Sequence, residues 1–91
     1  MSLVTVPEGW NRAACLAWAD NKQQKAIDLV LANLNAQQEK PPRLTLQLCY
    51  YLFLLGDYRS ATKFLVLQLQ HTPDHVEVLL NLAVCLSRSH Q

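Results

Sequence analysis

One apolar pattern occurs more than once along the chain, at nearly constant spacing. The segment SATKFLVLQL around Ala61 aligns with KAIDLVLANL around Ala26, and LNLAVCL around Leu82 aligns with LQLCYYL around Leu48. Both alignments give a period of roughly 34 to 35 residues, which is typical of repeat proteins. A pattern that returns at this period predicts a stack of short structural units, each of which buries its apolar side against its neighbour.

The spacing of apolar residues predicts an all-α fold of five helices in one domain. Apolar side chains recur every three or four positions, as expected for helices at about 8–19, 23–37, 42–55, 57–71 and 74–89. Prolines in the segments EKPPR and TPD separate the second helix from the third and the fourth from the fifth, and Asn21 can adopt the left-handed turn that ends the first. The third segment is strongly apolar, but Thr45 is its only β-branched residue, which favours a helix over a strand.

The segment LGDYRSA at 55–61 interrupts the apolar pattern with a short turn. Gly56 can take the positive φ that ends a helix. Asp57 can accept hydrogen bonds from the free amides at the start of the next helix. Because so few residues join the two helices, we expect them to fold back as an antiparallel hairpin.

Composition argues against nucleic-acid binding and against a membrane span. Eight basic and seven acidic residues give a net charge of +1, so no basic field attracts phosphate backbones. The longest apolar run, 48–55, is far below the roughly 18 residues that a membrane-spanning helix needs. The first residues lack the basic leader and apolar core of a signal peptide. We therefore expect a soluble, cytoplasmic protein without nucleic-acid or membrane partners.

The residue types of catalytic and metal sites are not arranged in any familiar pattern. The three cysteines, Cys15, Cys49 and Cys85, lie inside apolar helical patterns and are expected to be buried, reduced thiols. Pro73 separates His71 from His75 and breaks the helix that a ligand pair would need, so the histidines are expected at the surface or in loops. No nucleophile–base pair or glycine-rich phosphate loop is present. We expect no enzymatic activity, metal, cofactor or small-molecule substrate.

The repeating unit resembles the tetratricopeptide repeat, a helix–turn–helix unit of about 34 residues. The resemblance is most specific at 42–75, which carries Leu48, Gly56, Tyr58, Ala61 and Pro73 at the expected offsets. An earlier unit at 7–41 departs at the turn, where Asn21 replaces glycine, and has one extra residue. A half unit at 76–91 completes a single domain over 1–91. The flanking units match the family at four structural positions: Trp10, Ala14, Ala26 and Ala83. The alternative is an unrelated bundle of helical hairpins.

The resemblance implies a short right-handed solenoid whose small residues let helices approach closely. It also implies a protein–protein interaction scaffold, in which the first helices of each unit form a concave groove for a partner peptide or helix. Carried over by register, the groove positions are Asn11, Cys15, Trp18, Leu46, Tyr50, Phe53, Leu80 and Val84, with Glu77 and Arg88 at the edge. The alternative for these residues is a core position against sequence beyond the chain or a neighbouring chain.

One branch of the family binds the carboxyl terminus of chaperones through a clamp of lysine, arginine and asparagine. The matching positions here are Asn11, Cys15, Gln47, Glu77 and Asn81, which contain no cation. This sequence is therefore not expected to bind such tails.

Two alternatives to a peptide-binding scaffold stay open. The chain can be a self-assembly module, or an interaction domain attached to an enzyme that lies outside it. The segment 76–89 is apolar on more than one side, so we expect it to be covered by further repeats or by a second copy in a homodimer.

Overall fold

Five helices make up the fold of the computed structural model, which describes residues 4–89. In chain order they are α1 (Arg12–Ala19), α2 (Gln23–Asn35), α3 (Pro42–Leu54), α4 (Tyr58–His71) and α5 (Val76–Ser89). Each helix packs against the next one along the chain, and α3 also contacts α5. The predicted all-α class with five helices is confirmed.

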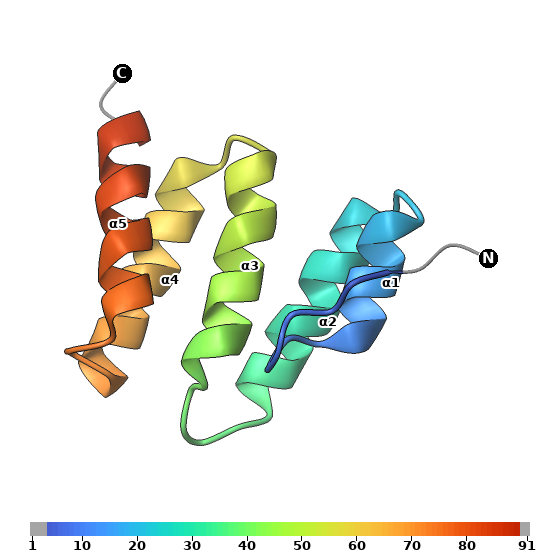
Figure 1. Ribbon diagram of the computed structural model, residues 1–91, viewed down its shortest axis with the longest axis horizontal. Coiled ribbons are helices and arrows are strands. Elements are labelled where there is room, and N and C mark those ends of the chain that lie inside the picture. Colours follow the sequence, from blue (N-terminus) through green and yellow to red (C-terminus); the bar gives the residue numbers. More distant parts are fainter. Residues whose placement is uncertain (1–3, 90–91) are drawn as a thin grey trace.

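The helices form two layers, with α1, α3 and α5 in one and α2 and α4 in the other (Figure 1). Successive helices run up and down, so each turn joins a helix in one layer to a helix in the other. In the view of Figure 1 the N-terminal segment, drawn in dark blue, passes in front of α1 and α2 before the first helix begins. Within the described residues, no helix is long and apolar enough to cross a membrane.

The turns follow the chemistry expected from the sequence. Asn21 has φ of 60° and Gly56 has φ of 80°, so both occupy the left-handed region at the end of a helix. The Asp57 side chain accepts a hydrogen bond from the Ser60 amide at 3.2 Å and caps α4. Pro42 opens α3, where its missing N–H costs nothing.

The first helix begins at Arg12, so the predicted start near residue 8 is wrong. Gly9 has φ of 81°, and the Asn11 side chain caps α1 by accepting the Ala14 amide at 2.9 Å. Neither residue has helical dihedral angles, since Gly9 has a positive φ and a capping residue such as Asn11 is extended. The helix can therefore begin only after Asn11. Trp10 consequently lies in the connection before α1. The other predicted helix ends differ from the observed ones by two residues or fewer.

Three of the four predicted small positions are fully buried. Ala14, Ala26 and Ala61 have no exposed surface, and they belong to the continuous core together with Leu48 and Leu65. All three cysteines are buried free thiols, as expected.

Ala83, the fourth predicted small position, is exposed on α5, so its expected close helix contact is not made. Within residues 4–89 no helix follows α5 to cover it.

Candidate functional site

Aromatic side chains fill the space between α1 and α3. The Trp18 and Tyr51 rings are stacked, with centroids 4.3 Å apart and planes 4° from parallel. Trp10 meets the same tyrosine edge-on at 6.0 Å and lies 5.6 Å from Tyr50. Tyr51 is buried, whereas 48% of Tyr50 is exposed. The cluster therefore joins the core to the surface of the α1–α3–α5 layer.

A buried amide supports this cluster from within. Gln47 has no exposed surface, and its Oε1 accepts a hydrogen bond from the Asn11 amide at 2.6 Å. Its Nε2 lies within hydrogen-bond distance of the Asn11 carbonyl (3.0 Å) and the Tyr51 hydroxyl (3.2 Å). The Tyr51 hydroxyl also lies 3.6 Å from Cys15 Sγ. Because its polar groups find partners, this network can be buried without a large desolvation cost.

Burial raises the pKa of Tyr51 to about 12, although the hydrogen bond from Gln47 opposes that change. Burial also raises the pKa of the Cys49 and Cys85 thiols. Since the thiolate is the reactive form of cysteine, this environment does not activate Cys49 or Cys85 as nucleophiles.

Apolar side chains are also exposed on α5, which contacts α3. The exposed fraction is 62% for Leu80 and 48% for Val84. Phe53 is half-buried, with its ring 5.1 Å from the Tyr58 ring and the Arg88 guanidinium 5.9 Å from its centroid. Phe53 therefore links the end of α3 to the end of α5. We call Tyr50, Phe53, Leu80 and Val84 the partner face.

The predicted groove residues separate into three groups in the structure. Tyr50, Leu80 and Val84 are exposed, and Asn11, Trp18 and Phe53 are half-buried. Cys15 and Leu46 are buried, each with 6% exposure, so their predicted place on an open surface is wrong. Cys15 lies beneath the Gln47–Tyr51 network. Leu46 belongs to α3, which contacts α2, α4 and α5 and is buried at every position from 44 to 49.

The positions that match the carboxylate clamp are occupied by internal contacts. Gln47 is fully buried, and Asn11 caps α1 and bonds to Gln47. The Glu77 carboxylate lies 2.8 Å from the Arg43 guanidinium.

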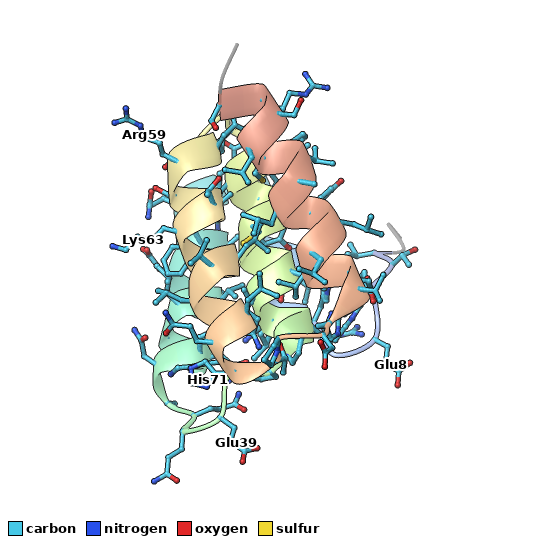
Figure 2. The ribbon with its side chains drawn as sticks, turned by 90° about the vertical axis from the view of Figure 1, so that its left-hand side faces the viewer. Glu8, Glu39, Arg59, Lys63 and His71 are labelled. Carbon is cyan, nitrogen blue, oxygen red and sulfur yellow. The ribbon has the colours of Figure 1, made fainter. Side chains whose placement is uncertain are left out.

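Charged side chains lie on both sides of the molecule (Figure 2). Figure 2 shows Arg59 and Lys63 projecting outward from α4, on the side of the α2–α4 layer. Glu8 projects on the opposite side (Figure 2). In the part of the chain that the structure describes, no three metal-ligating residues gather into a possible metal site.

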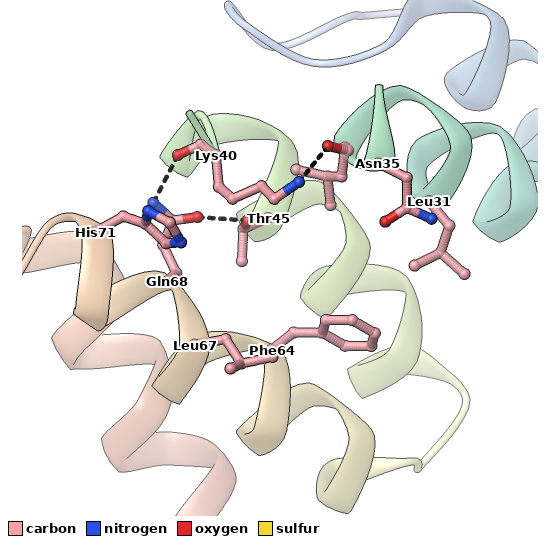
Figure 3. Close-up of a pocket in the computed structure, with 9 residues that line it drawn as sticks. Leu31, Asn35, Lys40, Thr45, Phe64, Leu67, Gln68 and His71 are labelled. Carbon is pink, nitrogen blue, oxygen red and sulfur yellow. Dashed lines mark hydrogen bonds between the residues drawn. The ribbon is translucent and has the colours of Figure 1, made fainter. Parts of the chain in front are cut away.

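A shallow hollow of about 230 Å³ lies between α2 and α4, with α3 as its floor (Figure 3). Gln68 Nε2 donates to the Lys40 carbonyl at 2.8 Å, and the Thr45 hydroxyl donates to Gln68 Oε1 at 2.7 Å. Lys40 Nζ donates to the Leu34 and Gln37 carbonyls at the end of α2. These polar groups already have partners, and the volume is below the roughly 300 Å³ of small ligand pockets. The hollow is a seam between helices.

Sequence reasoning did not predict that three polar residues connect distant parts of the fold. Gln47 and Gln68 are buried amides, and Arg43 joins the Glu8 carbonyl to the Glu77 carboxylate. One signal for Gln47 is present in the sequence: it stands inside the run LTLQLCYYL, where every face of the helix is apolar. Arg43 gives no comparable signal, because its partners lie 35 and 34 positions away.

No family model, curated protein or solved structure matches this chain in the comparisons with known proteins.

Proposed function

We propose that this chain is a helical-repeat interaction module of the tetratricopeptide kind, which binds a peptide or helix of a protein partner on its partner face. The observation that carries the proposal is the exposure of Tyr50, Leu80 and Val84 on the two adjacent helices α3 and α5. Exposed apolar surface that continues over neighbouring elements is typical of interaction sites.

The register of the repeat adds support. Tyr50 and Val84 occupy the same position in successive units, since the alignment of Leu48 with Leu82 also places Tyr50 over Val84. A ligand that crosses the layer would meet the same position of each unit in turn. Aromatic side chains are well suited to this role, because they offer a large contact area with few rotatable bonds.

The aromatic cluster supplies a rigid support for such a site. Tyr50 packs beside Trp10 and Tyr51, with ring centroids 5.6 and 6.1 Å away. Tyr51 is in turn fixed by Trp18 and Gln47. A side chain held in place before binding loses less entropy when the partner binds.

Peptides selected from a displayed random library against the whole chain test the proposal. We expect Tyr50→Ala and Val84→Asp to weaken binding of the selected peptides at least tenfold, with unchanged helical content by circular dichroism. Leu67→Ala is the matched control, because Leu67 is 44% exposed on α4 in the other layer. Peptides that tolerate both partner-face changes but lose affinity for Leu67→Ala would place binding on the α2–α4 layer and contradict the proposal.

A further inference from the structure

A second apolar surface lies on another side of α5. Leu79, Ala83 and Leu86 follow a spacing of four and three residues, which places them on one face of the helix. Leu79 is 45% exposed, Leu86 is 40% exposed, and Ala83 is also exposed. Within the described residues nothing covers this face.

The internal repeat shows what a covered form of this face looks like. The equivalent positions on α3, one unit earlier, are Thr45, Cys49 and Leu52, with 4%, 2% and 7% exposure. The contacts of this face go to α4: the Thr45 hydroxyl donates to Gln68, and Cys49 Sγ lies 3.5 Å from the Ala61 carbonyl. Helix α5 therefore exposes the face on which α3 carries an antiparallel helix.

The surface extends from α5 onto α4. Leu31 of α2 lines the seam with Phe64 and Leu67 of α4. The residue equivalent to Leu31 in the next unit is Val66, which is 45% exposed on α4. A helix seated on α5 as α4 is seated on α3 would also meet Val66. We call Val66, Leu79, Ala83 and Leu86 the open seam.

The contacts of α4 define what kind of helix fits such a seam. The α4 surface facing α3 has a fully buried alanine, Ala61, with Leu65 four residues later. Helix α5 offers the same combination, because Ala83 stands between Leu79, four residues before, and Leu86, three residues after. A second α5 helix that runs antiparallel to the first therefore presents a small residue with large apolar neighbours, as α4 does where it packs on α3.

We propose that the open seam binds the open seam of a second copy of this chain, so that α4 and α5 of each copy form a four-helix bundle around a twofold axis. The two α5 helices run antiparallel, and the Ala83 residues approach at the axis. Leu79 then faces Leu86 of the second copy, because the two leucines lie at nearly equal distances on either side of Ala83. A contact of this kind is isologous and closes at two copies.

The pairing leaves the partner face open. Leu80 and Val84 lie on a different side of α5 from Leu79 and Leu86, as their positions around the helix require. A dimer would carry two partner faces and bind a divalent partner more tightly than one copy does.

Light scattering over a series of increasing protein concentration tests the proposal. Because a single helix seam is a small interface, we expect a monomer at low concentration and twice the monomer mass at high concentration. Ala83→Lys is expected to stay monomeric throughout, since it places a charge at the axis. Asn81→Lys is the matched control, because it adds one lysine to an exposed site on another side of the same helix. Circular dichroism checks that both variants are folded.

A cysteine at the axis tests the geometry independently. Under mild oxidation, Ala83→Cys is expected to yield a disulfide-linked dimer and Asn81→Cys a monomer, since the three native thiols are buried. The proposal is overturned by a parent that stays monomeric, by a dimer that survives Ala83→Lys, or by equal crosslinking of both cysteines. It is also overturned if a synthetic peptide with the sequence of residues 57–72 occupies the seam of a monomeric parent, because the occupant is then a separate helix.

Discussion

Gln47 holds the backbone of Asn11 with both ends of its amide: its Oε1 lies 2.6 Å from the Asn11 nitrogen, and its Nε2 lies 3.0 Å from the Asn11 oxygen. The two residues are 36 positions apart. Asn11 is also the cap of α1, so this pair fixes the start of the first helix on the middle of α3. The backbones of α1 and α3 do not approach each other closely. This hydrogen-bonded pair and the stacked aromatic side chains connect the two helices instead.

Removing this amide should destabilise the chain. Gln47→Met keeps the length of the side chain but leaves the Asn11 backbone groups without their partner. An unsatisfied buried polar group costs about 1–3 kcal/mol, so we expect a loss of that size in the free energy of unfolding. Gln70→Met is the control, because Gln70 is exposed on α4. Denaturant titration measures both, and equal midpoints would show that the Gln47–Asn11 contact contributes nothing.

The fold was predictable because its determinants are local. Gly56 and Asp57 define a turn within a few residues, and Pro42 marks the start of a helix. The start of α1 was not predictable from periodicity, because Trp10 fits the apolar spacing yet lies in the connection. It packs against Tyr50 and Tyr51, which belong to α3 and are distant in the sequence.

The two described glycines with positive φ should differ in their tolerance of alanine. An added Cβ at Gly56 meets nothing within 4 Å, so Gly56→Ala carries only the conformational cost of about 1–2 kcal/mol. At Gly9 the same atom would lie 2.7 Å from Arg43 Cβ and 2.8 Å from its Cγ. These atoms are close to the backbone of α3 and have little freedom to move.

We therefore expect Gly9→Ala to displace the N-terminal segment as well, with loss of the Arg43 contacts to Glu8 and Glu77. Tryptophan fluorescence follows this displacement through Trp10, and thermal melts rank the two variants. A Gly9→Ala protein with parental fluorescence and stability would contradict the close approach.

The candidate site was only partly predictable, for a physical reason. Register identifies which residues of a repeat occupy equivalent positions, and it placed Tyr50, Leu80 and Val84 on exposed surface. The register does not show whether a neighbouring helix buries that position in a given unit. Leu46 and Leu80 are equivalent residues, yet 6% of one and 62% of the other is exposed. The difference arises because α3 lies between other helices, whereas α5 is the last helix of the described chain.

Ala61 and Ala83 are both small positions of the repeat pattern, but only Ala61 is buried against another helix. Ala61 has no exposed surface and lies against Cys49 of α3, so Ala61→Leu should force the helices apart at a cost of about 1–3 kcal/mol. Ala83→Leu changes an exposed position and should leave the stability of the monomer nearly unchanged at low concentration. Thermal melts of both variants measure the contrast. If Ala61→Leu melts with the parent, α3 and α4 are not packed closely at this residue.

Stability should fall at alkaline pH through Tyr51. In the unfolded chain this phenol ionises near its ordinary pKa of 10.0, whereas burial raises its pKa in the folded chain to about 12. Between these values the unfolded state releases the proton and the folded state keeps it. The stabilisation is therefore complete below pH 10 and is lost as the pH rises toward 12. Burial of the Cys49 thiol acts in the same direction.

The variant Tyr51→Phe cannot ionise at this position, so its free energy of unfolding should fall less steeply between pH 10 and 12 than that of the parent. Tyr50→Phe is the matched control, because it removes a phenol from the neighbouring, exposed position and keeps Tyr51 in place. Denaturant titrations at a series of pH values give the slopes. Tyr51→Phe also loses the hydrogen bond with Gln47, so the slope with pH decides the outcome and the absolute stability does not. Identical slopes for the parent and Tyr51→Phe would mean that Tyr51 keeps its ordinary pKa in the folded chain.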